Sequence, residues 1–188
     1  MNNFMKSVYA GIVIGLGGVV YLSVDNKIIG SFLFSIGLYS VLVFGFNLFT
    51  GKVCMKKNFL KPDVLLLVLL GNFVGTMIVG IFSNSKVKET AHVLMVNKYD
   101  KPVGRLLVDG ILCGICIAIA VYGYQRAEGA GKYLAVILGV MVFICAGTEH
   151  VVADMYYAVA AGMNLRALLV ILVVMIGNTI GGILFSFI

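Results

Sequence analysis

Charged residues are scarce in this chain: they make up 12% of its 188 residues, against 61% hydrophobic residues, and the mean hydropathy is +1.08. This composition excludes a soluble globular domain, because one domain of this length could not bury so much apolar surface and has few charged residues to cover it. Six membrane spans of about 20 residues would use roughly 120 positions and leave no room for a separate nucleotide-binding or catalytic module. The sequence therefore predicts a membrane protein with a single transmembrane domain over 1–188.

Features typical of other classes are missing as well. The four cysteines lie in or beside apolar stretches and lack the spacing of extracellular disulfides. The 14 lysines and arginines are scattered over loops, which excludes a nucleic-acid partner and favours contact with the lipid bilayer. No small-residue cleavage site follows the first apolar run, so we interpret that run as a span and not as a signal peptide. Tryptophan is absent, which leaves the tyrosines as candidate anchors at the membrane surfaces.

The apolar runs predict an all-α membrane protein with six transmembrane helices and both termini on one side. They fall at about 8–24, 28–49, 63–82, 103–124, 133–161 and 165–188. Lysines and arginines divide seven against seven between the two sides, so the count alone does not orient the chain. The densest short loop, at 56–61, favours cytoplasmic termini.

The second and fifth runs contain polar residues where a plain span should be apolar. Irregular backbone at membrane depth is tolerated only where protein buries it or where it lines a watery cavity. These two runs are therefore predicted to be broken helices that line a pathway. The polar residues are Asn47, Thr50, Gly51 and Lys52 in the second run, and Gly147, Thr148, Glu149, His150 and Asp154 in the fifth.

Four Gly-x-x-x-Gly pairs indicate an internal repeat, because they occur in matching order in the two halves. Each half holds three spans, so the second copy must be inverted relative to the first. The halves are about 1–85 and about 100–188, and a site is expected near the midplane where the two broken helices meet. The matched pairs are Gly11/Gly15 with Gly110/Gly114, and Gly71/Gly75 with Gly177/Gly181.

His150 is the clearest polar feature inside an apolar run. An ionisable side chain at that depth is costly and is by default a functional candidate. An imidazole in a dry constriction can donate a hydrogen bond to a passing anion, and it can also hold or lend a proton.

Five segments of the sequence resemble motifs of the formate/nitrite transporters, which are pentameric channels for small monovalent anions and include hydrosulfide channels. The order and spacing of the five segments carry the resemblance, since each alone is weak. They are Asn-Leu-Phe-Thr-Gly at 47–51, Gly-Asn-Phe-Val-Gly at 71–75, Gly-Ile-Leu-Cys-Gly at 110–114, Ala-Gly-Thr-Glu-His-Val-Val-Ala-Asp-Met-Tyr at 146–156 and Gly-Asn-Thr-Ile-Gly-Gly at 177–182. The sequence departs from the family pattern at Thr148, Val151, Asp154 and Gly114.

The resemblance implies roles for particular residues. His150 would be the central pore histidine, Thr50 its partner in the opposing loop, and Lys98 the lysine of the vestibule. The alternative for Lys98 is a solvated loop lysine, interchangeable with Lys101. Four apolar residues would narrow the pore: Phe34, Leu38, Leu48 and Phe143.

Other side chains would support the two breaks. Asn72 and Asn178 would satisfy loose backbone groups there. The carboxylates of Glu149 and Asp154 are expected to orient a break by accepting backbone N–H bonds. No cofactor or metal is expected in this arrangement.

The resemblance also implies the function and its setting. We expect an aquaporin-like architecture, a homopentamer, a bacterial plasma membrane, and a channel rather than an enzyme. Its partners would be protons and a small monovalent weak-acid anion: formate foremost, or nitrite or hydrosulfide. Positive charge would capture the anion, a proton from His150 or from water would neutralise it, and the neutral acid would pass the apolar constrictions.

The residues are also compatible with two alternative functions. One is a divalent-metal transporter that uses His150, Glu149 and Asp154 with Cys113 and Cys116. The other is an intramembrane hydrolase, which would need a nucleophile beside a base. Its candidate nucleophiles are Ser35, Ser40 and Thr50, with His150 as the base for Thr50.

Overall fold

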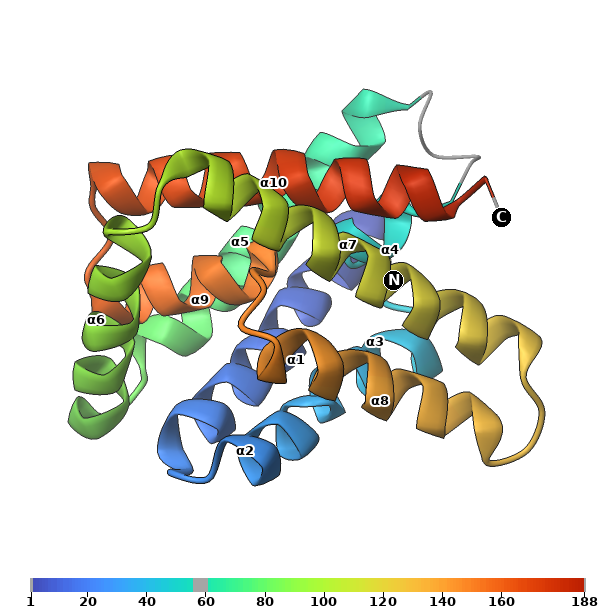
Figure 1. The fold of residues 1–188 in the computed structure, drawn as a ribbon, viewed down its shortest axis with the longest axis horizontal. Coiled ribbons are helices and arrows are strands. Elements are labelled where there is room, and N and C mark those ends of the chain that lie inside the picture. The colour runs from blue at the N-terminus through green and yellow to red at the C-terminus, as the bar shows by residue number, and fades with distance from the viewer. Residues whose placement is uncertain (1, 56–60, 188) are drawn as a thin grey trace.

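A computed structural model describes residues 2–55 and 61–187, and this part of the chain is helical, with ten helices and no strand. The loop on which the cytoplasmic orientation depends, 56–61, lies outside the described residues except for Lys61. In Figure 1, α6 lies at one end of the molecule, and the start of α1 and the end of α10 lie toward the other half.

Four helices in the described part are long and apolar enough to cross a membrane, as judged by length and composition. They are α1 (Asn3–Ser23), α5 (Pro62–Ile81), α7 (Val103–Arg126) and α10 (Leu165–Phe185). These helices confirm an all-helical membrane protein and coincide with the predicted first, third, fourth and sixth runs.

The second and fifth predicted runs are broken, as their polar residues indicated. The second consists of α2 (Lys27–Phe34), α3 (Ile36–Val43) and the short α4 (Phe49–Val53). The fifth consists of α8 (Gly131–Cys145) and α9 (Val151–Ala161).

A glycine in the left-handed region lies in each break. Gly45 has φ 65° before α4, and Gly147 has φ 73° before α9. Side chains with a Cβ rarely adopt such angles, so glycine lets the chain turn sharply from one helix segment into the next.

Helix α6 (Ser85–Tyr99) was not predicted, because its sequence is too polar to form an apolar run. Its side chains at Val87, Ala91, Met95 and Lys98 are buried. Intervals of three or four residues place all four on one face, and α6 packs against α9. The pattern of a helix with one buried face was therefore present, although the composition was that of a loop.

Close packing of two helix pairs organises the molecule. Helix α1 packs along α5, and α7 packs along α10, as Figure 1 shows for the second pair. A Cβ on Gly75 would lie 2.1 Å from the carbonyl oxygen of Val8, and one on Gly181 would lie 2.0 Å from that of Ile111. Only glycine permits the backbones to approach so closely.

The structure corrects the register of one glycine match. Gly11 faces the backbone of Asn72, and Gly114 faces the backbone of Asn178 in the same way. Gly11 therefore corresponds to Gly114, one helical turn further along than the match with Gly110. Spacing alone could not reveal this shift, because glycines four residues apart lie on the same helix face in either register.

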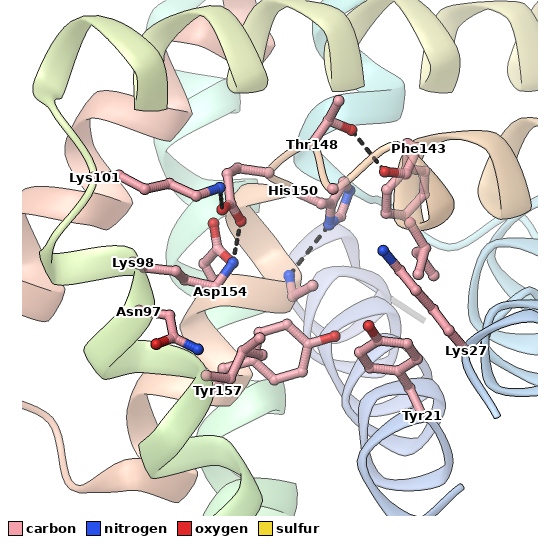
Figure 2. Close-up of a pocket in the computed structure, with 15 residues that line it drawn as sticks. Tyr21, Lys27, Asn97, Lys98, Lys101, Phe143, Thr148, His150, Asp154 and Tyr157 are labelled. Atoms are coloured by element: carbon pink, nitrogen blue, oxygen red, sulfur yellow. Dashed lines mark hydrogen bonds and ion pairs between the residues drawn. The ribbon is translucent and has the colours of Figure 1, made fainter. Parts of the chain in front are cut away.

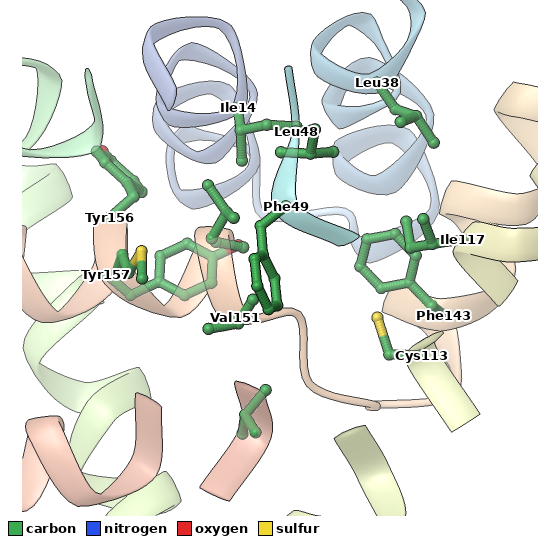
Figure 3. Close-up of a cluster of buried hydrophobic side chains, with 14 of the residues drawn as sticks. Ile14, Leu38, Leu48, Phe49, Cys113, Ile117, Phe143, Val151, Tyr156 and Tyr157 are labelled. Carbon is green, nitrogen blue, oxygen red and sulfur yellow. The ribbon is translucent and has the colours of Figure 1, made fainter. Parts of the chain in front are cut away.

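The buried core surrounds the two breaks. Figure 3 shows apolar side chains from several helices gathered around the starts of α4 and α9, including Phe49 and Val151, the first residues of these helices. The apolar core thereby holds the interrupted backbone away from lipid, which is the condition for irregular structure at membrane depth.

Candidate functional site

The two breaks meet through a hydrogen bond between Thr50 and His150. Thr50 lies in the first turn of α4, and His150 is the N-cap of α9. Oγ1 of Thr50 and Nε2 of His150 are 2.9 Å apart, and the two residues are only 2% and 3% exposed. Residues 100 positions apart in the sequence thus form one buried polar pair, as the resemblance implied.

The capping bond of His150 determines where its proton lies. Nδ1 accepts a hydrogen bond from the backbone N–H of Ala153 at 3.1 Å. A ring nitrogen that accepts carries no proton, so the neutral imidazole holds its proton on Nε2 and donates it to Oγ1 of Thr50. The threonine hydroxyl keeps its own proton for a further acceptor.

Two asparagines secure the breaks with the same three hydrogen bonds. Oδ1 of Asn72 accepts from the N–H of Phe49, and its Nδ2 donates to the carbonyls of Ser7 and Asn47, all at 2.8 Å. Asn72 is fully buried, and all three of these bonds go to backbone groups, so its side chain supports the interrupted backbone.

Asn178 repeats this pattern in the other half. Its Oδ1 accepts from the N–H of Val151, and its Nδ2 donates to the carbonyls of Gly110 and Glu149. Both asparagines therefore satisfy backbone groups that the interrupted helices leave open.

The four apolar residues expected to narrow a pore are all buried, and Phe143 contacts His150 of the Thr50–His150 pair directly. The ring of Phe143 stacks on the imidazole of His150, with 5.7 Å between centroids, and meets the ring of Phe34 edge to face at 6.2 Å. Leu38 and Leu48 line a small cavity of about 40 Å³.

A larger cavity of about 180 Å³ lies beside His150, and we call it the vestibule. Phe143, His150, Glu149 and Lys98 all line it. Gly51, which follows Thr50 on α4, lines the small cavity, and His150 lines the vestibule, so the two bonded residues lie next to one cavity each.

Ion pairs make up one wall of the vestibule, as Figure 2 shows. The ammonium of Lys98 pairs with the carboxylate of Glu149 and lies 2.9 Å from Oδ1 of Asp154. Lys101 lies 2.7 Å from Oε1 of Glu149 and 3.0 Å from Oδ2 of Asp109. Lys98 is buried and therefore not a solvated loop lysine.

This network corrects the expected role of Glu149 and Asp154. Both carboxylates were expected to accept backbone N–H bonds at the break. Among the described residues, the recorded hydrogen-bond partners of both are lysine ammonium groups. The backbone of the break is instead held by Asn178, because amide groups pair with backbone while carboxylates compensate buried lysines.

Several vestibule residues were missed from the sequence. Lys27 on α2 and Tyr21 on α1 line it opposite Tyr157 on α9. Asp109, which pairs with Lys101 behind the cavity lining, offered a signal, since an ionisable residue inside the fourth apolar run requires a partner. The others gave none, because only the fold brings α1, α2 and α9 together.

A family model described as formate/nitrite transporter matches residues 1–188. The chain belongs to the formate/nitrite transporter family. The nitrite transporter NirC of Salmonella typhimurium strain LT2 is 26% identical in an alignment that is 219 positions long with its gaps. The alignment covers 97% of this chain and 79% of that relative. The formate channel FocA of Haemophilus influenzae is also 26% identical, over 82% of this chain and 64% of the relative.

Solved structures of formate/nitrite transporters have the same fold. The structure titled FNT family ion channel gives a TM-score of 0.87 at 25% identity and covers 98% of this chain and 86% of that one. A pentameric formate channel with formate bound gives a TM-score of 0.82 at 23% identity, over 96% and 91% of the two chains. As a member of the family, the protein is a transporter or channel and not an enzyme.

Neither alternative function gains support from the geometry. Among residues 2–55 and 61–187, no three His, Cys, Asp or Glu side chains form a metal site. A hydrolase base must present a lone pair to its nucleophile, whereas Nε2 of His150 presents a proton to Thr50.

Proposed function

We propose that the protein is a channel for a small monovalent weak-acid anion, with formate as the first candidate and nitrite and hydrosulfide as the others. The observation that carries this proposal is the buried Thr50–His150 pair. It places polar hydrogen-bond donors between apolar side chains and next to a vestibule that contains lysines. Such a passage favours a small, hydrogen-bonding solute over a hydrated ion.

The solute crosses the constriction in its neutral form. Moving a bare charge into apolar surroundings costs several kcal/mol or more. The anion takes up one proton in the vestibule, the neutral acid passes Phe143 and Leu48, and the proton is released on the far side. One anion and one proton therefore cross together, and no net charge moves.

Water in the vestibule is the proposed source of that proton, and the hydroxide that this leaves returns to the bulk solution on the entry side. Neutral His150 could give up its Nε2 proton only by becoming an anion. A second proton would have to sit on Nδ1, where it would displace the N–H of Ala153 and put positive charge at the positive end of α9. His150 therefore acts as a fixed hydrogen-bond donor.

The same proposal includes the architecture and its setting. The chain forms two inverted three-helix repeats, supported by the matched bonds of Asn72 and Asn178. It assembles as a homopentamer with one pore per subunit in a bacterial plasma membrane, with cytoplasmic termini. The homopentamer is supported by the similar fold of a pentameric formate channel.

Stopped-flow uptake into proteoliposomes tests the function. Formate, nitrite, hydrosulfide and acetate are presented in turn at pH 7.5, 6.5 and 5.5, beside empty liposomes and liposomes that contain His150→Ala. For a carboxylic acid with a pKa of about 4, the acid fraction rises about tenfold for each unit that the pH falls. Uptake through the protein should rise with it.

The pH series separates this mechanism from conduction of the anion itself. Flux of one or two of these solutes, with an increase at low pH beyond the leak of empty liposomes, supports the proposal. Flux that stays constant between pH 7.5 and 5.5 contradicts neutral passage. No flux of any of the four contradicts the channel.

A further inference from the structure

The lysines of the vestibule differ in how far their charge is compensated. Lys98 and Lys101 are each paired with two carboxylates, and they share Glu149. Arg105 adds a further cation next to Asp109, at 2.9 Å from Oδ1. Three cations therefore meet three carboxylates in one connected network, which has little net charge to attract an anion.

Lys27 lies outside this network. It lines the vestibule from the first residue of α2, and its Nζ donates to the carbonyl of Cys145 at 3.1 Å. Among residues 2–55 and 61–187, no carboxylate is recorded as its partner. The other two ammonium protons of Lys27 are free to bind a ligand.

Lys27 supplies the net charge of the cavity. The lining residues include three lysines and two carboxylates, Glu149 and Asp154. Because Lys98 and Lys101 are paired, the uncompensated positive charge belongs to Lys27. Its side chain is exposed, so it is accessible from the aqueous end of the vestibule.

Two phenols line the vestibule together with Lys27. Figure 2 shows its Nζ between the imidazole of His150 and the ring of Tyr21. The rings of Tyr21 and Tyr157 lie 6.4 Å apart, and both residues line the same cavity. In the described part of the structure, neither phenol has a recorded protein acceptor, so both can donate to an anion.

We propose that Lys27, with the phenols of Tyr21 and Tyr157, forms the site that captures the anion, and that Lys98 serves to hold the break. This inference rests on the proposed anion channel and assigns its capture step. The ligand is a monovalent oxyanion or hydrosulfide small enough to enter a cavity of about 180 Å³. The captured anion then takes up its proton in the vestibule and passes as the neutral acid to the Thr50–His150 pair.

The chain offers a matched control for Lys27. Lys88 also donates its ammonium to the carbonyl of the last residue of an apolar helix, at 2.9 Å from the oxygen of Ile81. Lys88 does not line the vestibule. Lys27→Met and Lys88→Met therefore remove the same charge and the same kind of capping bond, and only the first changes the cavity.

The experiment measures formate and nitrite uptake by wild type, Lys27→Met, Lys27→Arg and Lys88→Met in proteoliposomes. Ionic strength is varied from about 10 mM to 1 M with an impermeant salt, which shortens the Debye length from about 30 Å to about 3 Å. Lys27→Met should reduce uptake at low ionic strength about tenfold, and the loss should shrink at 1 M. Lys27→Arg should keep most of the wild-type rate, and Lys88→Met should equal wild type.

The outcomes distinguish this inference from the function on which it rests. If wild type takes up the anion and Lys27→Met matches Lys88→Met at every ionic strength, Lys27 is not the capture residue, while the channel stands. If wild type takes up no anion, both proposals are overturned. If Lys27→Met and Lys27→Arg lose flux equally at all ionic strengths, with assembly intact by size exclusion in detergent, the charge has no role.

Discussion

Asn72 and Asn178, on α5 and α10, make equivalent sets of three hydrogen bonds, each to the first N–H of a short helix and to two backbone carbonyls. One side chain in each half thus joins the broken helix to a neighbouring long helix. Loss of either side chain would destabilise the fold strongly, because it would leave several buried backbone groups unpaired at once.

Asn178→Ala should lower the stability of the fold by about 3 kcal/mol or more. The loss comes from three hydrogen bonds, each worth about 1 kcal/mol net, and from the N–H and carbonyls left unpaired in the core. Thermal unfolding in detergent measures the effect. Thr179→Ala is the control, since within residues 2–55 and 61–187 that hydroxyl is recorded as donating to the carbonyl of Met175 of its own helix and to no other group. Equal midpoints for the two variants would show that Asn178 does not hold the break.

Thr50→Val should reduce uptake of the permeant acid about tenfold without unfolding the protein. Valine has the shape of threonine but no hydroxyl, so Nε2–H of His150 loses its acceptor and the solute loses a donor. One lost hydrogen bond of about 1.4 kcal/mol corresponds to that factor. Thr50→Ser restores the hydroxyl and should recover most of the flux. If Thr50→Val took up the acid as fast as wild type, the Thr50–His150 hydrogen bond would have no part in transport.

Nitrogen NMR of labelled histidine should find the proton of His150 on Nε2 at neutral pH. The chain has only two histidines, so His92→Gln leaves a single signal to assign. The tautomer follows from the bond that Nδ1 accepts from Ala153. The Thr50→Val background serves as comparison, because it removes the partner of Nε2 and leaves the capping bond. A proton on Nδ1 would contradict the capping geometry and make His150 a candidate base again.

The sequence was informative where a local rule applied. The polar residues of the second and fifth runs predicted the breaks, because membrane depth forbids unpaired backbone. The glycine pairs predicted close helix contacts but not their register. The motif around His150 led to the Thr50 partner only through the family resemblance.

The rest depended on contacts between distant segments. Glu149 and Asp154 gave no sign that their partners were Lys98 and Lys101, because both lysines are about 50 positions away, one at the end of the polar helix α6 and the other just after it. The role of Lys27 was equally hidden, since it is an isolated lysine at the start of an apolar run. Charge compensation is a property of the folded vestibule and not of any segment.

Gly181→Ala should separate α7 from α10 and prevent stable assembly. The new methyl group would lie 2.0 Å from the carbonyl oxygen of Ile111, which is helix backbone and cannot turn away. Overpacking of this kind costs about 1–3 kcal/mol or more. Gly51→Ala is the control, because its Cβ would meet Val121 at an ordinary 3.8 Å. Size exclusion in detergent should show loss of the assembled species for Gly181→Ala alone, and equal profiles would contradict the close contact.

Asp154→Asn should increase anion uptake at low ionic strength, by about threefold to tenfold. The amide oxygen of the new side chain would still accept a hydrogen bond from Lys98, but one negative charge would be lost from the vestibule wall. A unit charge about 8 Å from a ligand contributes on the order of 1 kcal/mol at an effective dielectric of about 40. Asp100→Asn is the control, because it removes the same charge from an exposed residue next to α6 that does not line the cavity. If the protein were instead a divalent-metal transporter, Asp154→Asn would lower its transport rate, because loss of a carboxylate ligand would abolish metal uptake. Anion uptake that falls in Asp154→Asn, with assembly and stability unchanged, would mean that the carboxylate assists the anion and would overturn the electrostatic account of the vestibule.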